Sequence, residues 1–200
     1  MQQIDKNIIY TANQYQYKSF ALLSPKERQD ILNWRNHEAI RLMMYNSDII
    51  TLDEHLSFIN SLDNRDDRYY WLAFKESTPY GIVYIADITG DGSAEVGLYR
   101  NPQISDNAGG LDLYWNFYNF LFFQLDFCSL VAGMDIRNKV AILLNSFLGF
   151  KYAHTKNIND RQFLMAICSK EDIKNDWYNK NNLREMLKYY QSDTFKNFGN

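Results

Sequence analysis

The residues with the clearest chemical potential lie on two segments in the middle of the chain. Glu95 lies in the apolar segment 93–99, and Gly109 and Gly110 precede the long apolar stretch 111–125. A carboxylate can accept a proton from a nucleophile. Glycines before a helix let backbone N–H groups converge on a phosphate, which the positive end of the helix dipole also attracts. These segments are therefore candidates for proton transfer and phosphate binding.

Further polar candidates lie in the N-terminal third. His37 and His55 could contact a substrate, although lone histidines on helices are usually structural or solvated. Arg35 and Arg41 could pair with a phosphate. For Arg35, a capping or ion-pair role is equally open.

Neither cysteine nor metal chemistry is indicated. Cys128 and Cys168 lie in apolar runs without a nearby His or a CxxC partner, so we expect both to behave as small hydrophobic residues. His, Cys, Asp and Glu do not recur at the spacing of a metal site. We expect neither a covalent acyl-enzyme nor a bound metal.

Composition narrows the class of partner. The 200 residues carry a formal net charge of −3, and 46% of them are hydrophobic. Nucleic-acid binding needs clustered Lys and Arg, so this charge argues against it. The sequence has no apolar run near the roughly 20 residues of a membrane span and no secretory signal pattern. We expect one cytoplasmic domain over residues 1–200, with its core at about 15–169 and a helical appendage at 170–200.

Capping signals define helices in the N-terminal third. Ser24 and Pro25 provide an N-cap and a first helical residue. The apolar pattern then predicts two short helices with a break near residues 35–37. Thr51 and Glu54 form a capping box for the next helix, whose buried face we expect at Leu52, Leu56 and Ile59.

Alternating apolar runs predict a sheet. Strands are expected at residues 16–23, 68–75, 80–88, 93–99, 128–134, 150–156 and 162–168. Tight turns at 76–79 and 89–92 make the second to fourth of these strands antiparallel. Helices are expected at 111–125 and 138–148. The first of these is apolar nearly all round, so it must be covered by the sheet or by a second subunit of a homodimer.

This order of elements resembles the GNAT superfamily of N-acetyltransferases over roughly residues 15–169. Within it, the pattern is similar to the N-acetyltransferases of pseudaminic acid biosynthesis, which act on the 4-amino group of UDP-4-amino-4,6-dideoxy-N-acetyl-β-L-altrosamine. The resemblance implies an α/β (α+β) fold, with a mixed, mostly antiparallel sheet that splays between its fourth and fifth strands and helices on both faces. It is carried by Trp34-Arg35-Asn36-His37, Met44-Tyr45, residues 54–59, and Glu95-Val96-Gly97-Leu98-Tyr99 with Asn101-Pro102.

The resemblance implies that acetyl-CoA binds where the fourth and fifth strands part. The pantetheine arm would bind the backbone of the fourth strand, at Val96, Gly97, Leu98 and Arg100. An ordinary edge strand is the alternative. The superfamily's pyrophosphate motif, (Gln/Arg)xxGx(Gly/Ala), falls on the loop 105–110, where Ser105 and Ala108 depart from it. The phosphate-binding residues would be Asn107, Ala108, Gly109 and Gly110, unless the glycines form only a turn.

Residues 138–150 resemble the superfamily's second signature, NxxAxxLYxxxGF. Asn138, Ala141 and Leu144 fit it and would contact the cofactor, whereas Asn145 replaces a tyrosine that looks like the general acid for the leaving thiolate. An amide cannot donate a proton and recover it as a phenol can. Asn145 could stabilise the thiolate, with Tyr152, Tyr99 or water as the acid, or it could have no chemical role.

Glu95 is the general base that the resemblance implies, because many GNAT enzymes use a matching Glu through ordered water. Strand alternation decides whether its side chain faces the cleft or solvent. The acceptor wall in this superfamily is N-terminal. We expect it to include Arg35, Asn36, His37, Tyr45, His55 and Tyr84.

The leading hypothesis is direct acetyl transfer in a ternary complex to a 4-amino-4,6-dideoxy nucleotide-sugar, for surface glycan or flagellin glycosylation. A protein N-terminus, a lysine or a small amine is an alternative acceptor, since Tyr84 and Gly133 stand where the pseudaminic acid enzyme has polar groups. A missing tyrosine and an imperfect glycine loop also fit a binding module that has lost catalysis.

Overall fold

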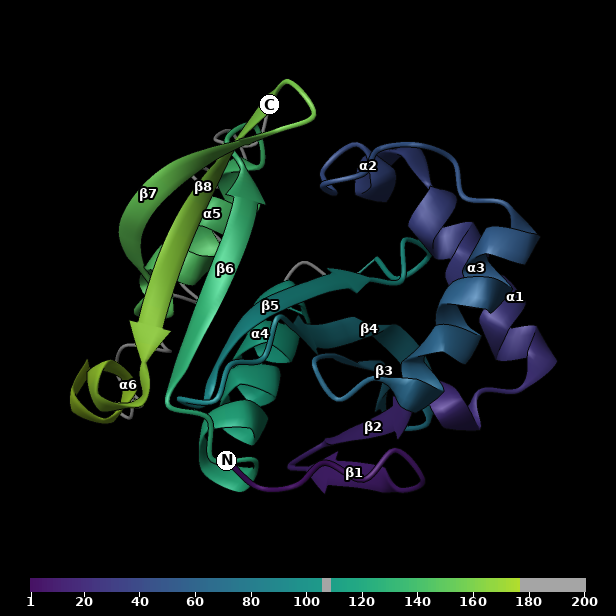
Figure 1. Cartoon of the computed structure of the whole chain (residues 1–200), viewed down its shortest axis with the longest axis horizontal. Helices are drawn as coiled ribbons and strands as arrows, with labels where there is room; N and C mark the ends of the chain where they lie inside the picture. The colour runs from purple at the N-terminus through teal and green to yellow at the C-terminus, as the bar shows by residue number, and fades with distance from the viewer. Residues whose placement is uncertain (106–108, 177–200) are drawn as a thin grey trace.

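The computed structural model describes residues 1–105 and 109–176, and within them eight strands form one sheet (Figure 1). The strand order is β1-β2-β3-β4-β5-β6-β8-β7, and all neighbours are antiparallel except β5 and β6. The strands are β1 (Ile9–Ala12), β2 (Tyr15–Ser19), β3 (Tyr69–Lys75), β4 (Thr78–Ala86), β5 (Ser93–Arg100), β6 (Ser129–Asp135), β7 (Lys151–Ile158) and β8 (Arg161–Ser169).

Helices cover both faces of this sheet (Figure 1). One face carries α1 (Pro25–Asn36), α2 (Glu38–Arg41) and α3 (Leu52–Ser61), and the other carries α4 (Gly109–Asn119) and α5 (Lys139–Phe147). A π-helical turn, Phe120–Gln124, extends α4. Short 3-10 turns follow β2 (Phe20–Leu22) and α3 (Leu62–Asn64), and α6 (Lys170–Asp176) follows β8. The mixed sheet with helices on both faces confirms the predicted fold class.

The capping signals predict helix starts correctly. Ser24 and Glu27 form a capping box at α1, and Thr51 and Glu54 form another at α3. The predicted break between two short helices falls at His37. The predicted buried face of α3 is wrong at Leu52, which is exposed at the first turn, while His55 and Ile59 are buried.

The sequence analysis missed β1, which forms a hairpin with β2. The turn passes through Asn13, whose φ of 54° is a left-handed conformation that asparagine tolerates better than most residues. The expected first strand also ends early, at Ser19, because a 3-10 turn begins at Phe20. The hairpin of β3 and β4 turns at Glu76 and Ser77, both with positive φ, and these residue types give little warning of such a turn.

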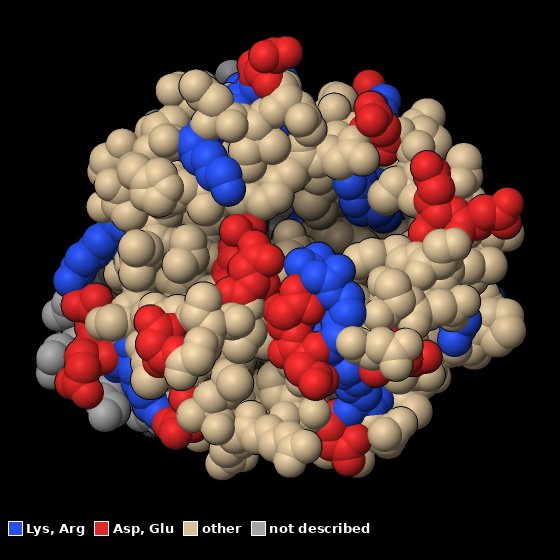
Figure 2. All heavy atoms as spheres, in the orientation of Figure 1, with Lys and Arg blue, Asp and Glu red and all other residues tan. Residues whose placement is uncertain are grey.

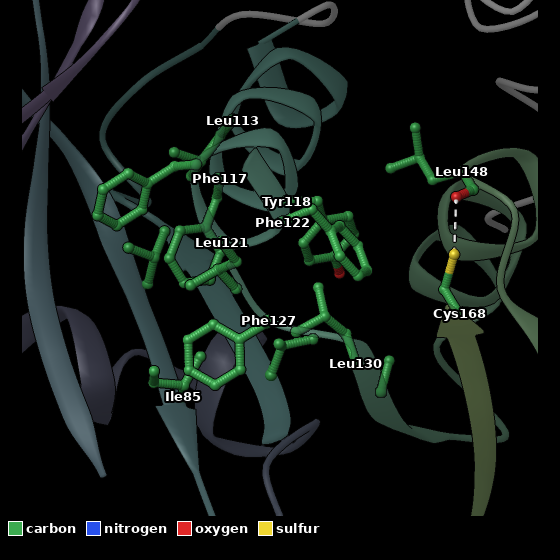
Figure 3. Packing of buried hydrophobic residues seen from close by; sticks show 14 of the residues in the cluster. Ile85, Leu113, Phe117, Tyr118, Leu121, Phe122, Phe127, Leu130, Leu148 and Cys168 are labelled. Carbon is green, nitrogen blue, oxygen red and sulfur yellow. Dashed lines mark hydrogen bonds between the residues drawn. The ribbon is translucent and has the colours of Figure 1, made fainter. Parts of the chain in front are cut away.

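The aromatic helix α4 and its π-helical extension are covered by the sheet of the same chain. Figure 3 shows side chains of these helices converging on residues of β4, β6 and β8. Of the two covers expected for this helix, the structure shows the sheet, and the homodimer stays a prediction. The fully buried residues of this region include Leu113, Phe117, Phe120, Leu121, Phe122 and Phe127.

The sheet splits between β5 and β6. These two strands pair from Ser93 opposite Ser129 to Val96 opposite Ala132. Beyond these pairs β5 stays beside β4, and β6 stays beside β8, so the two strands diverge into a V (Figure 1). In the part of the chain that the structure describes, the facing edges of β5 and β6 have no partner strand past this point. The splay predicted from the resemblance is therefore present.

Candidate active site

The V between β5 and β6 opens on the molecular face seen in Figure 2. This face is hollowed near its centre, between the part formed by β6 to β8 and the part formed by the N-terminal helices. Charged side chains gather beside the hollow. Unpaired backbone N–H and C=O groups at a strand edge need a hydrogen-bond partner. The edge of β5 from Gly97 to Tyr99 can therefore accept an extended ligand as an added strand.

Strand alternation directs Glu95 to the side of the sheet that carries α1 to α3. Ala94 and Val96 belong to the core beneath α4, so Glu95 points to the opposite face with Gly97 and Tyr99. The side chain is half-buried rather than solvated. The predicted base is thus on the cleft side of the sheet, beside the split.

The Tyr45 hydroxyl lies close enough to the Glu95 carboxyl for each group to affect the pKa of the other. Burial raises the pKa of Glu95 above its usual range, and Asp87 adds to the rise. The Tyr45 hydroxyl and the charge of Lys156 oppose it. A carboxylate with a raised pKa is a stronger base, so the setting suits proton abstraction near neutral pH.

Two glycines make room for tyrosine rings on this face. A Cβ added at Gly97 would lie 2.1 Å from the Tyr84 hydroxyl, and one added at Gly133 would lie 1.7 Å from the Tyr45 hydroxyl. Tyr84 also stacks on Tyr70, with ring centroids 4.7 Å apart. On this side of the V, the Tyr84 and Tyr45 rings therefore form a wall, and they occupy space that a side chain at Gly97 or Gly133 would fill.

Arg35 reaches this wall from α1. Its Nη2 donates to the Asn46 carbonyl at 2.6 Å, whereas its buried Nη1 has no hydrogen-bond partner among the described residues. Burial lowers the pKa of Arg35, and Tyr99 and Tyr84 oppose that shift. A buried donor without an acceptor costs free energy, which an anion bound beside Nη1 would offset.

The other predicted acceptor residues have structural partners. The Asn36 side chain donates to the Ile50 carbonyl at 2.8 Å and accepts from the Ile50 amide at 2.9 Å. His55 is buried, and its Nε2 lies 3.0 Å from the Arg28 carbonyl oxygen. His37 is exposed at the junction of α1 and α2. Asn36 and His55 therefore bind backbone groups of the N-terminal third, which for His55 supports the structural alternative.

At the position of the missing tyrosine, both polar atoms of the Asn145 side chain have hydrogen-bond partners inside the protein. It is 2% exposed, its Oδ1 accepts from the Tyr118 hydroxyl at 2.8 Å, and its Nδ2 donates to the Ala141 carbonyl at 2.9 Å. Nδ2 also lies 3.3 Å from the Met134 sulfur. The amide therefore ties α5 to α4 and β6, which supports the alternative of no chemical role.

The two replacement acids differ in position. Tyr152 lies on β7, separated from β5 by β6 and β8, which at the usual strand spacing is about 14 Å. Its side chain is 64% exposed and its hydroxyl lies 3.2 Å from Thr155 Oγ1. The structure does not bring Tyr152 to the V. Tyr99 does lie on the wall, where burial raises its pKa and the Arg35 charge opposes the rise.

The expected cofactor residues that the structure describes lie on β5, α4 and α5. Asn138 caps α5, accepting at 3.1 Å from the amide of Ala141. Gly109 and Gly110 are the first two residues of α4, so the helix begins two residues before the predicted start at residue 111. The predicted phosphate contacts at Asn107 and Ala108 lie outside the described residues. Val96, Leu98 and Arg100 lie on β5 beside the split, and Ala141 and Leu144 are buried on α5.

Sequence reasoning missed Asp135, which is 1% exposed and accepts hydrogen bonds from Arg137 and Arg161. An acid at the end of a predicted strand, two residues before an arginine, was the available signal. The cysteines also differ from each other. Cys168 is buried, which raises its pKa to about 12, whereas Cys128 is exposed.

The described residues contain no group of three or more His, Cys, Asp and Glu side chains able to hold a metal ion. No helix among them has both the length and the apolar character to cross a membrane.

Sequence comparison finds partial relatives. No protein-family model matches the chain. Two curated proteins named acetyltransferase PseH, from two strains of Campylobacter jejuni subsp. jejuni, are 36% and 33% identical to it over 87 residues. The match covers 44% of this chain and 54% of each relative. The chain thus spans about half the length of the curated relatives it matches.

Solved structures match over more of the chain. C. jejuni N-acetyltransferase PseH in complex with acetyl coenzyme A gives a TM-score of 0.62 at 23% identity, covering 78% of this chain and 98% of that one. Vibrio cholerae spermidine N-acetyltransferase with CoA and spermine gives 0.72 at 16%, covering 82% and 99%. A GCN5-related N-acetyltransferase from Brucella melitensis gives 0.68 at 13%, covering 96% and 89%. At these identities the likeness is one of fold.

Proposed function

We propose that this chain, which has the GNAT fold, is an N-acetyltransferase that moves an acetyl group from acetyl-CoA to a primary amine. The single observation that carries the proposal is the V between β5 and β6, with a half-buried carboxyl on its acceptor side. The sequence relation to PseH supports the same activity. Acetyl-CoA is used inside the cell, so we also propose a cytoplasmic location.

The free edge of β5 would hold the pantetheine arm through main-chain hydrogen bonds. The first turn of α4, at Gly109 and Gly110, would face the pyrophosphate with the positive end of the helix. Acetyl-CoA supplies the activated acetyl group. Because the arm would lie in the V, its reactive end would meet the wall that carries Glu95.

Glu95 would act as the general base. A primary amine arrives mostly as an ammonium ion, which has no lone pair for attack. The Glu95 carboxylate, whose pKa burial raises, accepts a proton from the amine directly or through one water. The neutral amine attacks the thioester carbonyl carbon, the carbon–sulfur bond breaks, and the proton that the nitrogen then loses protonates the CoA thiolate through water or Tyr99. Transfer is direct within a ternary complex.

The preferred acceptor is a 4-amino-4,6-dideoxy nucleotide-sugar. The unpartnered Nη1 of Arg35 supports an acceptor that carries an anionic group, which its phosphates would provide. The tyrosine wall offers apolar surface to a deoxy-sugar. A polyamine is disfavoured at this place because a cation would meet the Arg35 charge.

An amine panel tests the proposal. The purified protein is incubated with acetyl-CoA and a UDP-4-amino-sugar, spermidine, a peptide with a free N-terminus, or a lysine peptide. Thiol release and the mass of the product are measured. We expect turnover with the UDP-amino-sugar above all others. Turnover with another amine alone would overturn the acceptor, and thiol release with none would overturn the enzymatic activity.

A further inference from the structure

The loop 42–50, between α2 and α3, is tied to the far side of the V. The Leu42 carbonyl accepts from Arg137 at 3.1 Å and from Arg161 at 2.8 Å. The Met44 carbonyl accepts from Arg161 at 2.9 Å. Asn159, in the turn between β7 and β8, donates to the Tyr45 carbonyl at 3.3 Å. Figure 1 shows α2 standing opposite the ends of β6 and β8. The arginine and asparagine side chains named above bridge the space between these two parts.

Asp135 holds both arginines in place. Arg137 binds its carboxylate through Nε at 2.9 Å and Nη2 at 2.8 Å, and Arg161 binds it through Nε at 3.1 Å and through Nη2. The hydrogen bonds from Arg137 hold the pKa of Asp135 well below its usual range, and those from Arg161 add to the effect. We call Asp135, Arg137 and Arg161 the Asp135 clamp. The ionised, buried Asp135 carboxylate keeps both arginines in place, because the loss of either arginine would leave part of a buried charge without compensation.

The loop that the clamp binds includes Tyr45, whose ring packs against side chains of β8. The ring meets Phe163 edge to face, with centroids 4.8 Å apart, and the Arg161 guanidinium lies 5.0 Å from the centre of the Phe163 ring. The Tyr45 hydroxyl lies over Gly133, 3.9 Å from the Met165 sulfur, and beside the Glu95 carboxyl. A continuous line of contacts thus runs from Asp135 to Glu95.

We propose that the Asp135 clamp is a positioning unit that holds the loop 42–50 across the V and thereby fixes the Tyr45 hydroxyl over Gly133, beside the catalytic carboxyl of Glu95. The clamp residues are positioning residues, since none of them contacts Glu95. The catalytic part of this inference rests on the proposed function.

The sign of the expected effect follows from the groups that face Glu95. Asp87 raises the pKa of Glu95, whereas Tyr45 and Lys156 lower it, and Tyr70 and Tyr84 face the same carboxyl as neutral phenols. Releasing Tyr45 removes one of the lowering groups. The pKa of Glu95 then rises further, and the acid limb of the pH profile of kcat/KM moves to higher pH.

The test is a double-mutant cycle between Arg161→Met and Tyr45→Phe, read in that acid limb. Each single variant should move the limb upward and lower kcat/KM below the limb by about tenfold, the value of a hydrogen bond to a charged group. The double variant should match Tyr45→Phe alone, because both changes remove one contact. Additive shifts would overturn the proposal. Arg137→Met, at the more exposed arm of the clamp, gives the same test if Arg161→Met does not fold.

Amide hydrogen exchange tests the clamp without any activity. Exchange in a peptide covering residues 42–50 should speed up in Arg161→Met. It should not change in Lys18→Met, which breaks a similarly buried ion pair between β2 and α1. Unchanged exchange in Arg161→Met would overturn the clamp even in an active enzyme. Faster exchange in a chain that acetylates no amine would leave the clamp standing and overturn the proposed function.

Discussion

The two faces of β5 show how one strand serves two purposes. On one face Ala94 and Val96 are buried in the core, and Leu98 packs against that core under α4. On the other face Glu95, Gly97 and Tyr99 meet tyrosines and Arg35 from elements distant in the sequence. The first face consists of interchangeable apolar groups. The second depends on particular atoms, and it includes a carboxyl whose charged form burial disfavours.

This difference predicts that substitutions on the apolar face of β5 affect activity less than substitutions on its polar face. Apolar packing is distributed over many weak contacts, so the loss of a few carbon atoms lowers stability and leaves the fold in place. The opposite face has few contacts, and each has a chemical consequence. Substitutions on the two faces should therefore separate stability from activity.

The largest effect is expected for Glu95→Gln. If Glu95 is the base, kcat/KM near neutral pH falls by about 10² to 10⁴-fold and the acid limb of the pH profile disappears. The wild-type rate should rise with pH through the Glu95 pKa, because only the carboxylate accepts a proton. Steady-state rates between pH 5 and 9 measure this. Asp53→Asn, on the exposed side of α3, serves as the control, and equal rates in both variants would exclude Glu95.

A smaller effect is expected for Arg35→Met. Removing the guanidinium should raise KM for an anionic acceptor by about 10 to 100-fold, because a hydrogen bond to a charged group is worth about 1.5 to 3 kcal/mol. KM for a small neutral amine should stay within about twofold. Arg28→Met is the matched control, since Arg28 lies on the same helix and donates to the Leu23 carbonyl. A KM change of equal size for both acceptors would contradict an anion subsite.

Gly97→Ala should disturb the chemical face by about 1 to 3 kcal/mol. The new Cβ would lie 2.1 Å from the Tyr84 hydroxyl, so the ring must leave its stack on Tyr70. We expect a lower melting temperature together with a several-fold change in KM. Gly90→Ala is the control, because nothing lies within 4 Å of a Cβ there. Equal melting temperatures for the two variants would show that the wall adapts freely.

The smallest effect on activity is expected for Val96→Ala, on the apolar face. Removing two methyl groups from the core should cost about 1.5 kcal/mol of unfolding free energy, at roughly 0.8 kcal/mol per carbon. Urea unfolding measures this change. The value of kcat should remain within about twofold of wild type. A loss of kcat as large as that in Gly97→Ala would end the distinction between the two faces.

Local signals predicted much of the fold. Ser24 and Thr51 start their helices where the capping pattern indicated, because side-chain caps act within one turn. The hairpin β1–β2 was missed because Asn13 and Gln14 form a weak turn signal. His55 was expected at the acceptor and is buried against Arg28, a contact that only the packing of α1 on α3 creates.

Site residues were predicted less well where long-range contacts decide. Glu95 and Tyr45 both came from the sequence, but their contact did not, since 50 residues separate them. Asn145 stood out as a departure from the tyrosine pattern, and its bonds to Tyr118 and Ala141 emerge only from packing. The structure places Tyr152 away from the V, because two strands, β6 and β8, lie between β7 and β5, and nothing in its own segment indicates that order.

By itself the sequence determined the helices and most strands, because these depend on periodicity and on neighbours a few residues away. The same periodicity separated the apolar face of β5 from the face that carries its acid, Glu95. Only the tertiary structure decided where β5 and β6 stop pairing, which side of the V receives Glu95, and that Asp135 ties the loop 42–50 over it. These features arise from hydrogen bonds and packing between segments far apart in the chain, whose geometry no local pattern encodes.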